Sequence, residues 1–297
     1  MLKNILMLSV PFIMLLLYSV VACFLGYGLF IALDGSLELR KLISKSTQIL
    51  LILSIYPLAR YLQHSAAELG FVNFTRFMKH IAGGMILGVI SLLPILYLSY
   101  ALDITLLNTA KVWTISSLLG NLAIALLLAF IISLLEEPMF RGILITAYIK
   151  RIGISTAILI SSFYYAILHF IKTKTPINIE EAQLSDSFQL LGEALQNLFN
   201  PQHLGALWAL LMVGIFLAVM RTHLKLSLAW CIGCHAAWVW QIKMAHKLVI
   251  VNPDSDLVFL VSPYDGVIGP MVAIWLSLLI GSYFIYVSYN SVSTHSY

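Results

Sequence analysis

Long runs of apolar residues dominate the chain, and short polar segments separate them. A helix that crosses the hydrocarbon core of a bilayer needs about 20 mostly apolar residues. Applied to these runs, that length predicts eight transmembrane helices. In chain order the expected spans are Ile5–Leu33, Gln48–Tyr61, Ile81–Leu102, Thr114–Leu135, Ser155–Ile171, Leu204–Met220, Leu226–Lys243 and Val267–Tyr289. The second is the shortest and ends near Pro57 and Arg60, so we expect it to be a tilted or partial span.

Two of the polar connections are longer than turns. The segment Ser185–Phe199 places its large apolar side chains on one helical face, which predicts an interfacial helix lying on the bilayer. The segment Asn252–Gly266 is rich in Pro, Asp and Ser, which predicts a structured outer loop.

Composition supports a membrane protein and excludes other classes. Of the 297 residues, 61% are hydrophobic and only 10% are charged, whereas soluble domains average about half apolar and a quarter charged. The net charge of +4 is small and the basic residues are scattered, so we expect no nucleic-acid partner. The fold class predicted is an all-α, polytopic integral membrane protein, with the lipid bilayer as its surroundings and a bacterial-type cytoplasmic (inner) membrane as its location.

Ionisable residues inside apolar runs are the first candidates for chemistry, because burying them in a membrane costs free energy. Glu136 and Glu137 are adjacent, so on a helix their side chains point about 100° apart. Glu137 and Arg141 are four residues apart and can pair on one face. Glu136 then has no partner in its own helix and is a candidate general base. The alternative is a helix that ends at the membrane surface with a solvated Glu–Arg pair.

Two histidines also lie within apolar segments. Tyr165 and His169 share a helical face, although a single histidine there is weak evidence of function. Cys231, Cys234 and His235 match the attachment motif of c-type haem. That motif occurs in soluble exported segments, whereas these residues lie within an apolar run. We therefore expect both cysteines to be packing residues and His235 to be the functional one.

Depth connects these residues. Glu137, His169 and His235 lie 13, 16 and 10 residues from the ends of their apolar segments on one side of the membrane. At 1.5 Å per residue, these counts are depths of about 20, 24 and 15 Å below the same surface. Two carboxylates and two imidazoles can therefore meet in one buried site.

These residues resemble the motifs of the type II CAAX prenyl endopeptidases and their bacterial relatives, the CPBP (Abi) intramembrane proteases. Glu136, Glu137 and Arg141 match the first motif, Glu-Glu-x-x-x-Arg, and Tyr165 with His169 match the second, an aromatic residue followed by His. His235 matches the third, but Val239 stands where that motif has Asn or Asp. The resemblance extends over about Leu119–Lys243.

The resemblance implies an intramembrane endopeptidase that hydrolyses a membrane-anchored peptide or protein. Glu136, assisted by His169, would activate water, and His235 would donate a hydrogen bond to the oxyanion. Glu137 and Arg141 would hold the site together. Val239 cannot donate or accept, so a second oxyanion donor would either be missing or come from elsewhere, for which Trp238 and Trp240 are candidates.

No cofactor is expected, with a divalent metal such as zinc at the Glu/His cluster as the alternative. A metal-free reaction is favoured because Arg141 would compete with a cation for Glu137. The alternative function is a non-proteolytic membrane scaffold or an immunity (self-protection) factor of the same family, which Val239 favours. Along the chain we expect N-terminal transmembrane helices over 1–112, a CPBP-like catalytic core over 113–250, and an outer loop with a C-terminal transmembrane helix over 251–297.

Overall fold

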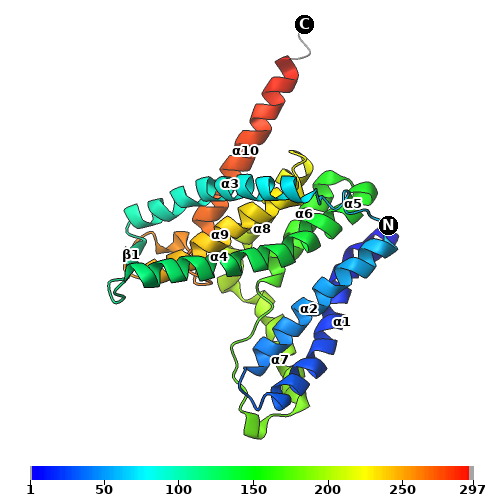
Figure 1. The fold of residues 1–297 in the computed structure, drawn as a ribbon, viewed down its shortest axis with the longest axis vertical. Helices are drawn as coiled ribbons and strands as arrows, with labels where there is room; N and C mark the ends of the chain where they lie inside the picture. Colours follow the sequence, from blue (N-terminus) through cyan, green and yellow to red (C-terminus); the bar gives the residue numbers. More distant parts are fainter. Residues whose placement is uncertain (1, 294–297) are drawn as a thin grey trace. The chain divides into compact units, whose positions relative to one another are not determined.

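The computed structural model describes residues 2–293 and is mostly helical. Its α-helices are α1 (Leu2–Ala32), α2 (Leu39–Tyr61), α3 (Phe74–Ala101), α4 (Ile115–Glu137), α5 (Ile145–Ile152), α6 (Ile154–Leu168), α7 (Leu184–Gln196), α8 (Leu204–Thr222), α9 (Leu228–Leu248) and α10 (Pro270–Ser293) (Figure 1). The strands β1 (Thr105–Leu107) and β2 (Val249–Val251) form one short antiparallel pair. The predicted all-α, multi-pass fold is confirmed.

The number of spanning helices differs from the eight that the apolar runs predict. Among the described residues, six helical segments are long and apolar enough to cross a membrane. They are Leu8–Ala32, Leu39–Tyr61, Phe74–Ala101, Ile115–Ile152, Pro201–Thr222 and Pro270–Asn290. The chain is therefore a multi-pass integral membrane protein with about six spans of this kind.

The two remaining predicted spans correspond to α6 and α9, and each falls short for a physical reason. Helix α6 has 15 residues, which is about 22 Å of helix against a hydrocarbon core of about 30 Å. Helix α9 is long enough but carries His235, Gln241 and Lys243, which lower its hydropathy. Most of α9 is buried among other helices, so its side chains pack against protein and need not be soluble in lipid.

The second helix begins earlier than expected, at Leu39 and not near Gln48. Its first turns are polar toward solvent, but Leu39 and Ile43 are buried against α1. Charged residues near the start of α2 interrupt the apolar run in the sequence, so run length alone did not predict the first turns of the helix. The face of α2 that packs against α1 nevertheless continues through those turns.

The chain forms two compact units, which are described separately. The first comprises the residues up to His64 together with Ile167–Pro201, and the second comprises Ser65–Ala166 and the residues from Gln202 onward. The division into 1–112, 113–250 and 251–297 follows chain order and stays a prediction.

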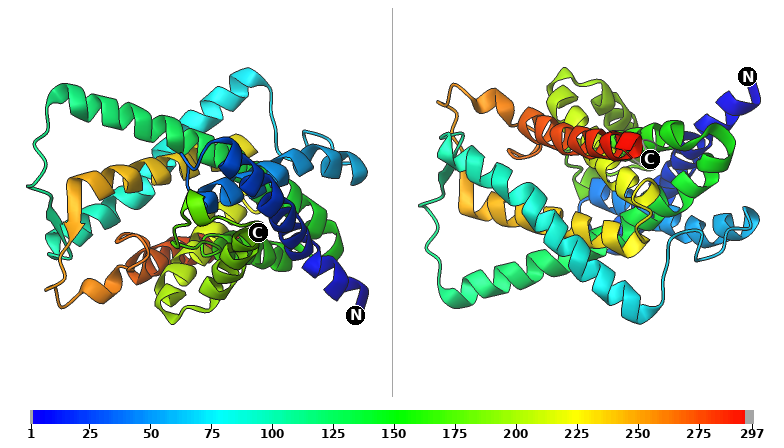
Figure 2. Two further views of the ribbon diagram at one scale, coloured as in Figure 1. Left: turned by 90° about the horizontal axis from the view of Figure 1, so that it is seen from below. Right: turned by 90° about the horizontal axis from the view of Figure 1, so that it is seen from above.

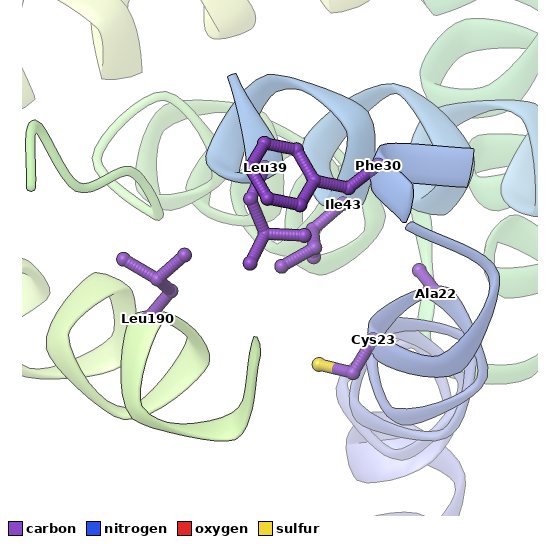
Figure 3. Packing of buried hydrophobic residues seen from close by; sticks show 6 residues of the cluster. All are labelled: Ala22, Cys23, Phe30, Leu39, Ile43 and Leu190. Carbon is purple, nitrogen blue, oxygen red and sulfur yellow. The ribbon is translucent and has the colours of Figure 1, made fainter. Parts of the chain in front are cut away.

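In the first unit, α1, α2 and α7 pack around one apolar cluster (Figure 3). Phe30 of α1, Leu39 and Ile43 of α2, and Leu190 of α7 meet there. The predicted helix at Ser185–Phe199 is present as α7. The α7 residues that are buried are Ser187, Leu190 and Ala194, because this helix turns that face to α1 and α2.

In the second unit, α9 is the central helix and lies between α3 and α4 (Figures 1 and 2). Helix α8 packs against both α9 and α10. The outer faces of α3, α4 and α10 carry exposed apolar side chains, for example Ile90, Leu127 and Leu278, as expected of helices that face lipid.

Candidate active site

Helix α4 continues directly into a π-helical segment, η1 (Pro138–Leu144). Pro138 lacks an amide hydrogen and cannot complete the regular hydrogen-bond ladder, which favours a wider turn here. Ser161 of α6 donates its hydroxyl to the Phe140 carbonyl at 3.0 Å. Single π-helical turns of this kind occur frequently at functional sites.

The Glu137–Arg141 pair is buried. Arg141 Nη1 donates to Glu137 Oε1 at 3.0 Å, and both side chains are 0% exposed. Arg141 Nη2 also donates to the Gly214 carbonyl of α8 at 3.3 Å. The alternative of a solvated pair at the end of a helix is therefore wrong, because α4, η1 and α5 form one continuous helical segment around it.

Aromatic rings surround the guanidinium. The ring centroid of Tyr165 lies 4.4 Å from Arg141 Cζ, and that of Phe140 lies 5.6 Å away. The Tyr165 and Phe140 rings meet edge to face, with centroids 5.3 Å apart. Cation–π contacts gain strength where water is absent, so these rings stabilise the buried charge. This is the structural role of Tyr165 in the site.

His235 reaches the pair from α9. Its Nδ1 lies 2.8 Å from Glu137 Oε1, the same oxygen that Arg141 contacts. Arg141 donates to the same oxygen, so Glu137 Oε1 acts as an acceptor, and we assign the proton of this hydrogen bond to His235 Nδ1. Glu137 thereby fixes the orientation of the imidazole and directs Nε2 away from the pair.

Close packing of α9 against α3 holds His235 at this depth. A Cβ on Gly233 would lie 2.2 Å from the Ile81 carbonyl oxygen, and one on Gly84 would lie 2.3 Å from the Trp230 carbonyl oxygen. Only glycine allows the two backbones to approach this closely, a common device in membrane helix pairs.

Glu136 lies on the other side of the imidazole. Its Oε2 is 3.9 Å from His235 Nε2, beyond hydrogen-bond length but within ion-pair range. The Glu136 side chain is 26% exposed, whereas that of His235 is 4% exposed. Among the described residues, Glu136 Oε2 has no hydrogen-bond partner although the atom itself is buried. The two adjacent carboxylates therefore have different surroundings.

Of the five predicted site residues, the second unit brings four together: Glu136, Glu137, Arg141 and His235. His169 follows the last residue of α6 and belongs to the first unit, so its part in the site stays a prediction. Among the described residues, no group of three or more His, Cys, Asp or Glu side chains is arranged to hold a metal ion.

The two tryptophans considered as extra donors are already engaged. Trp238 Nε1 donates to Ser91 Oγ at 2.9 Å, and Trp240 Nε1 donates to the Leu122 carbonyl at 3.2 Å. Neither indole is available to an oxyanion in this arrangement, so that suggestion is wrong. The cysteines are packing residues as expected: Cys231 and Cys234 are both 0% exposed.

Sequence reasoning missed two contributors to the site. The Gly214 carbonyl binds Arg141, and Ser161 holds the π-helical turn. A backbone carbonyl carries no signal in a sequence, and one serine among several in an apolar helix does not stand out. Both contacts depend on which helices pack side by side.

These features define a class of protein: a polytopic helical protein with a buried Glu–Arg–His cluster and a second, more exposed carboxylate. Residues 118–241 match the family described as type II CAAX prenyl endopeptidase Rce1-like. The predicted resemblance is thereby confirmed over this part of the chain, which contains all four clustered residues. No curated protein sequence matches the chain, and no solved structure does.

Proposed function

We propose that this protein is an intramembrane, glutamate-dependent endopeptidase. The observation that carries the proposal is that Glu136 Oε2 lies 3.9 Å from His235 Nε2. On the other side of the imidazole, Glu137 contacts His235 Nδ1 and is itself paired with Arg141. A base and a hydrogen-bond donor that face each other beside a partly open position form an arrangement suited to acyl transfer to water.

In the proposed reaction, Glu136 takes a proton from water as the water oxygen bonds to the scissile carbonyl carbon. In this step His235 is the imidazolium, so Nδ1 donates to Glu137 while Nε2 donates a hydrogen bond to the carbonyl oxygen as it becomes an oxyanion. The proton on Glu136 then passes to the amide nitrogen as the carbon–nitrogen bond breaks. His169 is proposed to assist Glu136, as the family resemblance implies.

The proposed substrate is a membrane-anchored peptide or protein. The family match names prenyl-CAAX endopeptidases, and a site within helices that face lipid is reached most readily by a chain that is itself anchored in the bilayer. The proposed location is a bacterial-type cytoplasmic membrane. The proposed reaction uses no metal, since Arg141 and His235 already occupy Glu137 Oε1.

The experiment compares wild type with Glu136→Gln in proteoliposomes at matched protein level. The first probe is a fluorescence-quenched peptide that ends in S-farnesylcysteine and three further residues; the second is the peptide content of membranes with each variant. Glutamine keeps the shape of the side chain but takes no proton, so cleavage should fall by about 10²–10⁴-fold. His235→Ala should act similarly, and combining the two should add little.

The matched control is Glu181→Gln, which changes a carboxylate in the polar connection that precedes α7. It should leave cleavage unchanged. If Glu136→Gln retains substrate processing and the biological phenotype of wild type, the protein is not a glutamate-dependent protease.

A further inference from the structure

One end of the second unit is assembled around the segment that precedes α3. Lys150 Nζ, in the last turn of α5, contacts Glu68 Oε1 at 3.2 Å. Arg221, in the last turn of α8, donates from Nη2 to the Glu68 carbonyl at 2.7 Å. The Leu228 amide, at the start of α9, donates to the Gly70 carbonyl at 2.9 Å. The end of α5, the end of α8 and the start of α9 therefore lie together.

The start of α3 lies at the same end. Its His80 Nδ1 is 2.6 Å from the hydroxyl oxygen of Ser227, the residue before α9. The next turn of α3 packs against the first turn of α9, because a Cβ on Gly83 would overlap the ring of Trp230. We call this end of the unit the basic end and define it as residues 65–80, 150–153 and 221–230.

Basic side chains are concentrated at the basic end. Among its described residues are six lysines and arginines: Arg76, Lys79, Lys150, Arg151, Arg221 and Lys225. All of these except Arg221 are exposed. Glu68 is the one acidic residue among those described there, and it is already in contact with Lys150. Six positive charges and one negative charge give the basic end a net charge of +5.

The opposite end of the unit has no such excess. It is joined by the pair of strands β1 and β2, and Asn252 Nδ2 donates to the Asp103 carbonyl at 2.9 Å. In Figure 1, α5 marks the basic end and β1 marks the opposite one. The charged residues described at the opposite end are three lysines and four aspartates: Lys111, Lys243, Lys247, Asp103, Asp254, Asp256 and Asp265. The net charge there is −1, so the positive charge of this unit lies at one end of its helices.

The basic side chains lie where membrane-spanning helices terminate. The spanning segments Phe74–Ala101, Ile115–Ile152 and Pro201–Thr222 each have one terminus at the basic end. Phe71 and Phe74 lie beside the basic residues and are 37% and 78% exposed. Exposed aromatic side chains next to lysine and arginine are typical of segments that lie in the headgroup region of a bilayer.

Anionic phospholipids are the partner whose chemistry fits this combination. Lysine and arginine form charge-assisted hydrogen bonds with phosphate oxygens. Clusters of about four to eight such residues next to the end of a spanning helix are attracted to anionic lipid surfaces. A lipid also presents acyl chains to the apolar side chains that α3 and α4 expose, for example Ile90 and Leu127, whereas a soluble phosphate does not.

We propose that the basic end is an interaction surface for the headgroups of anionic phospholipids. The surface is separate from the Glu/His site, and the proposal does not depend on the endopeptidase function.

The test measures the relative affinity of the purified full-length chain for two lipids in mixed micelles. The probes are phosphatidylglycerol and phosphatidylcholine with the same pyrene-labelled acyl chain, and energy transfer from the tryptophans reports their binding. Wild type should prefer phosphatidylglycerol. The triple variant Arg76→Gln, Lys79→Gln, Lys225→Gln should lower that preference by at least about fivefold, the factor expected for one basic residue close to an anionic surface.

The matched control is the triple variant Lys111→Gln, Lys243→Gln, Lys247→Gln. It removes the same charge from the opposite end and should keep the wild-type preference. Equal binding of the two lipids by wild type, or equal losses of preference in the two triple variants, would overturn the proposal. Glycerol 3-phosphate at matched ionic strength should not displace the labelled lipid, and displacement would show a site for a small phosphate in place of a lipid surface.

A salt titration of wild type tests the same surface independently of how the variants fold. Raising the salt concentration from about 0.1 to about 1 M shortens the Debye length from about 10 to about 3 Å, so exposed charges are screened. The preference for phosphatidylglycerol should then fall toward equal binding of the two lipids. A preference that salt leaves unchanged would contradict an electrostatic surface.

Discussion

Removing the charge of Arg141 should destabilise the protein strongly, and Arg141→Met is the variant that isolates the effect. Methionine approximates the length of the arginine stem and keeps contact with the Tyr165 and Phe140 rings. The substitution leaves Glu137 as a buried carboxylate that has lost its permanent cation, in a position that is 0% exposed. Removing one partner of a buried pair costs about 3–5 kcal/mol.

That cost corresponds to a change of roughly two to four orders of magnitude in the unfolding equilibrium, since 1.4 kcal/mol is a factor of ten. Loss of the cation–π contact adds about 0.5–2 kcal/mol, of which the methionine sulfur recovers part through its own contact with the rings. The assay is reversible unfolding of the purified protein in mixed micelles, followed by circular dichroism.

The double variant Glu137→Gln with Arg141→Met tests the reasoning. It removes both charges and retains a carbonyl oxygen that accepts from His235 Nδ1, so most of the lost stability should return. Arg76→Met, at an exposed position in α3, is the control and should unfold like wild type. If Arg141→Met unfolds like wild type, or if the double variant is as unstable as the single one, the pair is not a buried, mutually compensating unit.

Two further predictions concern metal and pH. Treating the protein with 1,10-phenanthroline should leave cleavage of the farnesylated peptide unchanged, because the proposed site engages Glu137 with Arg141 and His235; inhibition that added zinc reverses would show that a metal takes part. The Ser65 amide and Lys150 lower the pKa of Glu68 from 4.5 to about 2. A group with a lowered folded-state pKa contributes stability above its unfolded value and loses it as pH falls through the folded one. The segment around Glu68 should therefore lose hydrogen-exchange protection between about pH 4.5 and 2, and Glu68→Gln should abolish that dependence.

The residues of the site could be found from the sequence because their chemistry conflicts with their surroundings. Placing charged and imidazole side chains within apolar runs costs free energy, so such residues are few and each is a candidate for function. The Glu137–Arg141 contact also follows from sequence, because a spacing of four places both on one helical face. The helical fold can be predicted from the length of the apolar runs, because a backbone in lipid must form its hydrogen bonds within its own segment.

Contacts between helices could not be found in this way. The hydrogen bond from His235 to Glu137 requires α9 to lie against α4, and the hydrogen bond from Arg141 to Gly214 requires η1 to approach α8. Pairing of helices depends on the fit of whole surfaces, for example at Gly84 and Gly233, and a single sequence does not specify which surfaces meet.

The count of spans was too high because the length of an apolar run does not distinguish a helix that faces lipid from one that is buried in protein. A hydropathy criterion measures solubility in lipid, and a helix that is buried among other helices has little need of it. Helix α9 places His235 and Gln241 among buried neighbours, so it is held by polar contacts and close packing. The apolar run over α9 therefore predicts a helix, but it does not indicate that protein and not lipid surrounds that helix.

The adjacent carboxylates Glu136 and Glu137 have different surroundings, which suit them to different roles in the proposed reaction. Glu137 is 0% exposed, and its Oε1 accepts from both Arg141 and His235, so its charge is compensated and its position is fixed. Glu136 is 26% exposed and faces His235 Nε2 without a hydrogen bond to it. In the proposed reaction these surroundings separate two roles: Glu137 orients the imidazole, and Glu136 transfers the proton. Since consecutive side chains on a helix point about 100° apart, one turn of α4 presents both roles to the same imidazole.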